Sequence, residues 1–315
     1  MMDTLGTFLA LAVASTVPIM AAACGGAMAE KARSTNISLD GTMLIAALVA
    51  LAVTERTGSA WAGLTAAVIA GGVYALVLAA ATFWMGCDII IAGIALNLLA
   101  TGAVMLVTSV ALHAPGTYSP PGVPTLPRVG IGPLAAVPLL GPALDNQSVL
   151  VYLAAALVAL SWATMRHTVL GVWIVAVGES PDAVAAAGLS PVKVRTAAIL
   201  ASGLASGLAG AFLTISSVTT FNTQTTNGLG FIAFAAVIFG RATVIGATLA
   251  SILFGLATAA SLAFQGTGFF DAQLTHAWPY VATVVALGLI GVTRARSRAR
   301  EPRSTNYLPA IVPKG

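Results

Sequence analysis

Long apolar runs recur along most of the chain and constrain its fold more than any other feature. A helix that crosses a bilayer needs about 20 mostly apolar residues, because the hydrocarbon core is about 30 Å thick. The runs lack the alternation over about ten residues that marks the strands of a membrane barrel. The sequence therefore predicts an all-α polytopic membrane protein. About nine segments are transmembrane candidates by this criterion: 5–28, 41–54, 60–84, 88–112, 148–165, 196–216, 229–240, 243–264 and 277–293.

The composition excludes the main alternatives to a membrane fold. Hydrophobic residues make up 58% of the chain and charged residues only 8%, whereas soluble domains carry about 25% charged residues. A water-soluble globule of this size could not bury so much apolar surface, so a soluble enzyme is excluded. Disorder is excluded too, because disordered chains are poor in apolar residues and rich in charge.

The positive charges predict the orientation of the chain, because Lys and Arg collect in short cytoplasmic loops. The net charge of +4 comes from the basic C-terminal segment 294–315, which is expected in the cytoplasm. The loop 166–195 then lies on the same side, and the Pro- and Gly-rich loop 113–147 is external. Three further basic residues are also cytoplasmic in this arrangement: Lys31, Arg33 and Arg241. Only two basic residues, Arg56 and Arg128, are then expected on the external side of the membrane.

This orientation predicts two parts of unequal size. Residues 1–293 form a transmembrane domain that contains the cytoplasmic and external loops. Residues 294–315 form a basic cytoplasmic tail. The N-terminus is expected outside and the C-terminus in the cytoplasm.

Two of the apolar segments, 41–54 and 229–240, are too short to cross comfortably, and a polar stretch precedes each. The stretches are 36–41 and 222–228, and the predicted orientation puts the first on the cytoplasmic side and the second on the outer side. Such a pair is typical of an inverted-topology repeat. Irregular backbone is tolerated at membrane depth only where it lines a cavity or is buried in protein. The breaks therefore predict a translocation path, with ordinary Asn- and Gly-containing loops as the alternative.

The residues expected to line this path carry amide, hydroxyl or carboxylate groups. They are Asn36, Ser38, Asp40, Asn97, Asn222, Gln224 and Asn227. Asn97 lies within the apolar segment 88–112, where its amide could instead hydrogen-bond a neighbouring helix. Asp88 begins the same segment and is expected to cap the helix, because a carboxylate suits the positive end of the helix dipole.

The segment 178–189 predicts a short helix inside the cytoplasmic loop. Ser180 suits the N-cap and Pro181 the first helical position. Gly188 ends the helix at the C′ position. A helix of about seven residues is too short to span the membrane or to be stable alone, so it must dock on something. A partner protein is favoured, because the helix lacks the bulky apolar and basic residues of the alternative, a lipid-surface helix.

These motifs resemble one family. Glu179–Gly188, followed by Val192–Arg195, looks like the coupling-helix loop of ABC importer permeases of the sugar, nucleoside and branched-chain amino acid group. Asn36–Gly41 is similar to the Asn-Ile-Gly-Leu-Glu-Gly stretch of the simple-sugar and nucleoside branch. Gly228–Arg241 resembles that branch's Gly-x-Gly-Phe…Ala-x-Ala…Gly-Arg run, and Ala95–Leu99 fits as well. The resemblance covers residues 15–265.

The sequence departs from the family pattern at a few positions. Asp40 stands where Glu is usual and Ser38 where Gly is usual. Val175 stands where the family's loop often has Arg. The acidic exchange keeps the charge, whereas the missing Arg removes one possible contact with the ATPase or with lipid.

The resemblance implies the inverted-repeat fold of a type II ABC importer and a permease subunit that does no catalysis itself. The implied partners are a second permease subunit, two ATPase subunits and an external solute-binding protein, in a bacterial plasma (inner) membrane with no nucleic acid. The residues implied to couple to the ATPase are Gly178, Glu179, Ser180, Pro181, Asp182, Ala183, Ala187 and Gly188. ATP and Mg would be bound by the ATPase and no cofactor or metal by this chain, whose sequence has no GxxxxGK[ST] loop. An amide-rich path would suit a nucleoside or a simple sugar.

Two other classes of function stay open at this point. An ion-coupled secondary transporter of the inverted-repeat class would work alone, but a proton relay needs acidic or His groups inside spans, and no long span has an acid at its centre. A non-transporting scaffold or a membrane enzyme subunit is the other alternative. An intramembrane enzyme needs clustered catalytic groups, whereas His113, His167 and His276 fall in loops or at helix ends.

Overall fold

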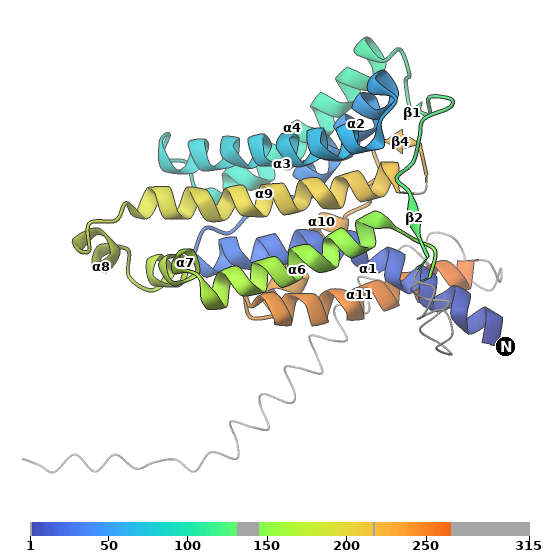
Figure 1. The fold of residues 1–315 in the computed structure, drawn as a ribbon. Helices are drawn as coiled ribbons and strands as arrows, with labels where there is room; N and C mark the ends of the chain where they lie inside the picture. The colour runs from blue at the N-terminus through green and yellow to red at the C-terminus, as the bar shows by residue number, and fades with distance from the viewer. Residues whose placement is uncertain (1, 131–144, 217, 266–315) are drawn as a thin grey trace, which may run out of the picture.

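The computed structural model describes residues 2–130, 145–216 and 218–265. In this part of the chain the long helices run along one common direction, with short strands at one end and the small helix α8 at the other (Figure 1). We call these the strand end and the α8 end of the bundle. The predicted segment 277–293 and the basic tail 294–315 lie outside the described residues.

The helices account for most of the described chain. They are α1 (Met2–Lys31), α2 (Leu39–Thr57), α3 (Ala60–Phe83), α4 (Ile89–Leu106), the π-helix η1 (Val107–Ala111), α6 (Val149–His167), α7 (Val169–Glu179), α8 (Pro181–Ala186), α9 (Pro191–Ile215), α10 (Leu229–Phe239) and α11 (Val244–Gln265). Four two-residue strands form two antiparallel pairs: β1 (Thr117–Tyr118) with β4 (Phe221–Asn222), and β2 (Arg128–Val129) with β3 (Gln147–Ser148).

Among the described residues, six helices are long and apolar enough to cross a membrane. They are α1, α3, α4 with η1, α6, α9 and α11. The all-α character predicted from the apolar runs is therefore confirmed, whereas a total of about nine spans is not. The six helices and the apolar exterior of the bundle agree with a chain that passes through the membrane several times.

Two local predictions were wrong. The segment 41–54 is not a short helix, because α2 has 19 residues and continues past the apolar run to Thr57. Charged residues at both ends of α2, Asp40 and Arg56, interrupt the apolar pattern but not the helix. The loop 166–195 contains a second helix, α7, of 11 residues. By contrast, α10 has only 11 residues, as its short apolar run predicts.

Small residues let the central helices approach closely. A Cβ added to Gly203 in α9 would lie 2.5 Å from the carbonyl oxygen of Gly71 in α3, and one added to Gly207 would lie 2.6 Å from that of Ala67. A Cβ added to Gly25 in α1 would lie 2.6 Å from the Cβ of Ala205. In a bilayer, helices associate through such close packing because lipid tails are as apolar as the side chains.

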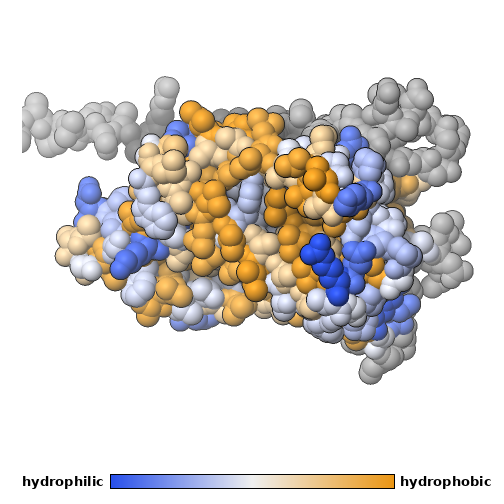
Figure 2. Space-filling model, turned by 90° about the horizontal axis from the view of Figure 1, so that it is seen from above, coloured by the Kyte–Doolittle hydropathy of each residue, from blue (hydrophilic) through white to orange (hydrophobic). Residues whose placement is uncertain are grey.

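One face of the bundle is apolar across its middle (Figure 2). Figure 2 shows hydrophobic side chains gathered across the centre of one face and hydrophilic ones toward both ends. Many large apolar side chains of the bundle are exposed, including Ile91, Leu98 and Leu106 along the length of α4. A soluble protein rarely exposes such a continuous surface, so this belt is the part of the bundle that contacts lipid.

Candidate functional site: the junction of the two polar breaks

The two polar breaks enter the bundle from opposite ends and meet inside it. The first follows α1, whose last residue, Lys31, has its carbonyl next to Gly178 at the α8 end. The second follows β4, which pairs with β1 at the strand end. The Asp40 carboxylate accepts hydrogen bonds from the Gly230 N–H at 3.0 Å and from the Thr226 hydroxyl at 3.2 Å.

This contact joins the two polar stretches, which approach each other from opposite ends of the bundle. Helices α2 and α10 begin at the same junction, and Asp40 lies in the first turn of α2. A carboxylate there faces the N-terminal ends of two helices, where free backbone N–H groups favour a negative charge. The contact also pairs polar groups that would otherwise be costly inside a bilayer.

Gly230 permits this contact because it has no side chain. A Cβ at position 230 would lie 2.3 Å from both the backbone nitrogen and the Cα of Asp40. Just before it, Asn227 and Gly228 adopt positive φ angles of 42° and 77°, the left-handed conformation that Asn and Gly adopt most readily. The Gly-x-Gly pattern at 228–230 is thus explained by a tight turn followed by a close backbone approach.

Asn97 ties α4 to the first break. Its Nδ2 donates to the Ile37 carbonyl at 2.9 Å, and its Oδ1 accepts from the Gly41 N–H at 2.7 Å. The alternative that the Asn97 amide bonds a neighbouring segment is thus confirmed; whether it also meets a solute stays a prediction. Asp88 caps α4, as predicted, by accepting from the N–H groups of Ile90 and Ile91.

Asn36 and Ser38 lie in the interior of the bundle. The Asn36 amide donates to the Ser202 hydroxyl of α9 at 3.0 Å. Its Oδ1 accepts from the Ser38 N–H at 3.0 Å and from the Ser38 hydroxyl at 2.8 Å. The exposed fractions are 2% for Asn36 and 0% for Ser38. These two side chains therefore hold the first break against α9 in this conformation.

The other predicted path residues open onto a pocket. Asn222, Gln224 and Asn227 are exposed and line a cavity of about 470 Å³ on the strand-end side of the junction. Thr220 and Thr225 line it too and were missed, although the run Thr219–Asn227 is visibly rich in hydroxyl and amide groups. Leu213 and Val218 line it as well, so the part of the wall formed by described residues is uncharged.

The predicted coupling segment folds as its sequence indicates. The Ser180 hydroxyl accepts from the Ala183 N–H at 3.3 Å, Pro181 occupies the first turn, and Gly188 has φ of 81° just past the helix. Val184 is only 4% exposed and packs on a cluster that includes Met28 and Val194. Figure 1 places α8 at the tip of the bundle, beyond α7 and before α9.

The residues of this segment divide into two groups. Gly178 is buried, and a Cβ there would lie 2.0 Å from the Lys31 carbonyl oxygen. Pro181 is half-buried. The remaining residues predicted to couple are exposed: Glu179, Ser180, Asp182, Ala183, Ala187 and Gly188. The exposed group forms a polar and small-residue surface, whereas Gly178 lets α7 pack on the end of α1.

Comparison with known families decides the identity of the chain. Residues 8–292 match a family model described as a branched-chain amino acid transport system permease component. The chain belongs to this family. It is a transport permease and a multi-pass membrane protein rather than an enzyme, and the family favours this function over a secondary carrier or a scaffold.

Individual relatives of the permease align along nearly their whole length. The present chain is 32% identical over 309 residues to the guanosine ABC transporter permease NupQ of Bacillus subtilis, and the alignment covers 93% of each chain. It is 27% identical over 300 residues to the nucleoside ABC transporter permease NupC of Lactococcus lactis, covering 91% of this chain and 93% of the relative. No solved structure matched the chain.

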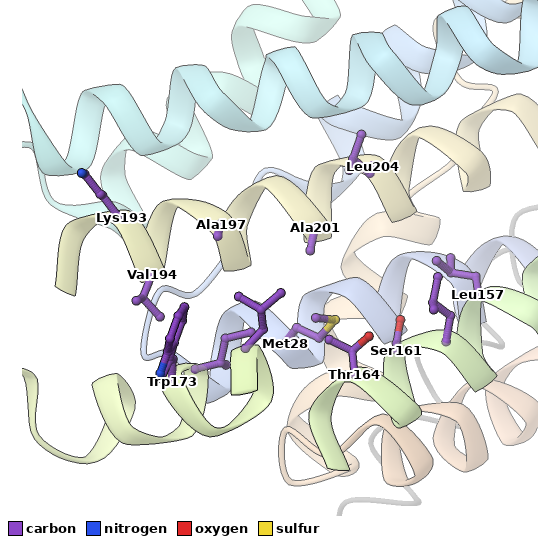
Figure 3. Close-up of a pocket in the computed structure, with 13 residues that line it drawn as sticks. Met28, Leu157, Ser161, Thr164, Trp173, Lys193, Val194, Ala197, Ala201 and Leu204 are labelled. Atoms are coloured by element: carbon purple, nitrogen blue, oxygen red, sulfur yellow. The ribbon is translucent and has the colours of Figure 1, made fainter. Parts of the chain in front are cut away.

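A second cavity of the permease, between α6, α7 and α9, differs in character. It has a volume of about 440 Å³ and is lined mainly by apolar side chains such as Met28, Leu157 and Ala201. In Figure 3 these side chains point into the space between the helices, whereas the Lys193 ammonium points away from it. The groove offers few groups that could recognise a polar solute, which sets it apart from the pocket at the junction.

Proposed function

We propose that this permease carries a nucleoside or a simple sugar through the pocket beside the junction. The observation that carries the proposal is the uncharged wall of amide and hydroxyl groups formed by Asn222, Gln224 and Thr225. Amides both donate and accept hydrogen bonds, as the hydroxyls and base edges of a nucleoside require. The names of the two relatives, a guanosine and a nucleoside permease, support the nucleoside as the first candidate.

In this proposal the energy comes from two separate ATPase subunits, which bind ATP and Mg. A second permease subunit completes the path, and an external solute-binding protein delivers the solute. The exposed surface of α8 is the docking site for the ATPase, because a six-residue helix on the tip of the bundle presents polar and small side chains there. Its buried residue, Val184, anchors the helix to the bundle.

The contacts of α7 suggest how a push on α8 would reach the junction. Gly178, at the end of α7, lies against the Lys31 carbonyl at the end of α1. The first break begins there and ends at Asp40, whose carboxylate bonds Gly230 of α10. In our mechanism, ATPase closure moves α8 and α7, and the displacement passes along the break to the starts of α2 and α10.

We further propose that the α8 end faces the cytoplasm of a bacterial cell and the strand end faces outward. The basic residues Lys31, Arg166 and Lys193 lie at the α8 end, which the positive-inside rule assigns to the cytoplasm. Helix α2 runs from the junction to the strand end and α10 runs to the α8 end. This opposite course supports an inverted repeat whose halves meet at Asp40 and Gly230.

Uptake by the assembled transporter tests the proposal. The permease is produced with its ATPase, its second permease and its binding protein, and the entry of labelled guanosine and labelled glucose is measured. We expect Gln224→Leu to reduce uptake of the carried solute at least several-fold, with unchanged amounts of protein in the membrane. Thr101→Val is the matched control, because among the described residues Thr101 bonds the Asn97 carbonyl of its own helix and does not line this pocket. Uptake of neither solute, or full uptake by the Gln224→Leu variant, would contradict the proposal.

A further inference from the structure

A third cavity, on the other side of α7, lies where three helix termini come together. It has a volume of about 580 Å³. Its wall includes Lys31, the last residue of α1, and Arg166 in the last turn of α6. Val175 of α7 and the start of α11 at Val244 complete the enclosure.

The position of this cavity sets its depth relative to a membrane. Helices that span a bilayer end near the headgroup region, because their apolar lengths match the hydrocarbon core. The ends of α1 and α6 and the start of α11 surround the cavity, and all three helices are long enough to span. The cavity therefore opens at headgroup depth, and Trp162 in its wall is the kind of residue enriched at that level.

The charged side chains in the wall of this cavity have one sign of charge. Of the described residues that line it, Lys31 and Arg166 are charged, and both are cations. The remaining wall is mostly apolar, with Trp162 half-exposed and Ile245 54% exposed. A ligand that fits must carry a negative group beside an apolar body.

We propose that this cavity binds an anionic phospholipid. Lys31 and Arg166 hold the phosphate, and an acyl chain lies along Trp162 and Ile245 toward the bilayer. Basic pockets between membrane helices bind anionic headgroups in this way. The bound lipid would tie α1 and α6 to the start of α11, close to the contact between Gly178 and Lys31 that positions α8. Because the inference rests on the membrane location and not on the solute, the failure of the nucleoside proposal would leave it standing.

Quenching of tryptophan fluorescence by brominated lipids tests the proposal. The full chain retains only Trp162, the other four tryptophans are replaced by Phe, and the protein is reconstituted in phosphatidylcholine vesicles. Part of the lipid is then exchanged for brominated phosphatidylglycerol or for brominated phosphatidylcholine. His167 is kept in every variant, because its ring lies edge-on to Trp162 at 5.4 Å.

We expect phosphatidylglycerol to be preferred about fivefold, the effect of roughly one basic residue near a membrane surface. Lys31→Gln with Arg166→Gln should abolish the preference, and Arg166→Gln alone, at an exposed position, should lower it. Arg33→Gln is the matched control at a neighbouring exposed site and should retain it. A second control retains only Trp84, which is 74% exposed, at the same end of the bundle, and should show no preference.

Three results would overturn the proposal. Equal quenching of Trp162 by the two lipids would show that the cations do not select a headgroup. A preference that survives in the double variant would place the lipid elsewhere. Loss of the preference on adding inorganic phosphate at millimolar concentration would indicate a site for a small anion rather than for a lipid.

Discussion

The carboxylate of Asp40 accepts a hydrogen bond from the backbone N–H of Gly230, 190 residues further along the chain, at 3.0 Å. This contact joins the starts of two helices that run to opposite ends of the bundle. Hydrogen bonds between the two polar breaks add to those within each break, so the conformation of each break depends on the other. The junction is therefore expected to respond to substitutions on both sides.

Gly230→Ala should disrupt the junction through the backbone. The new Cβ would stand 2.3 Å from the Asp40 backbone, and a main-chain clash cannot be relieved by rotating a side chain. We expect a clear drop in thermal stability in detergent and a loss of uptake. Gly102→Ala in α4 is the control, because among the described residues no atom beyond its own stretch of helix lies within 4 Å of the added Cβ. That variant should be neutral or up to about 1 kcal/mol more stable; equal behaviour of the two variants would contradict the prediction.

Removing the Asp40 carboxylate should cost more than removing one of its partners. Thr226→Val loses a single hydrogen bond, and hydrogen bonds to charged groups contribute about 1.5–3 kcal/mol. Asp40→Ala loses both bonds and leaves the Gly230 N–H unpaired, so its free energy of unfolding should fall further. Unfolding of both variants in the same detergent checks the order. A Thr226→Val variant as unstable as Asp40→Ala would mean that Thr226 acts through something other than this bond.

Val184→Ser should separate ATP hydrolysis from transport. Val184 is the buried residue of α8, so a hydroxyl there weakens its attachment to the bundle while leaving the exposed surface intact. We expect the ATPase still to bind and hydrolyse ATP, with solute uptake reduced several-fold. Ala185→Ser, at an exposed position of the same helix, is the control. Unchanged uptake by the Val184→Ser vesicles would argue against α8 as the transmitting element.

The strand end should lose stability at alkaline pH because of Tyr118. Burial and the hydrogen bond to the Glu55 carboxylate raise the pKa of Tyr118 above its ordinary value. A tyrosine whose folded pKa is raised contributes full stability below its unfolded pKa of about 10, and this is lost as the pH rises through the folded pKa.

Tyr118→Phe should therefore flatten the pH dependence of stability above about pH 10. The melting temperature of the wild type should fall more steeply there than that of the variant, and the two curves should run parallel at neutral pH. Glu55→Gln removes the partner charge and should give an intermediate slope. Parallel curves for all three proteins above pH 10 would disprove the role of this pair.

The candidate site was only partly predictable. Asn222, Gln224 and Asn227 could be recognised because a polar run before a short apolar helix is a local pattern, and they do line one pocket. Asn36 and Ser38 belong to an equally polar run. Their side chains, however, form hydrogen bonds to each other and to Ser202. Which polar run faces a cavity depends on distant helices, and the pattern carries no information about them.

What the sequence determined by itself is the part governed by short-range chemistry. Apolar runs of helical length predict α1, α3, α4, α6, α9 and α11, and the Ser180–Gly188 pattern predicts the ends of α8, because caps and hydrogen bonds of a helix lie within a few residues of one another. The tertiary structure alone decided that the two breaks meet. Asp40 reaches Gly230 only because α2 and α10 pack on each other and on α1, and that packing depends on contacts between residues far apart in the chain.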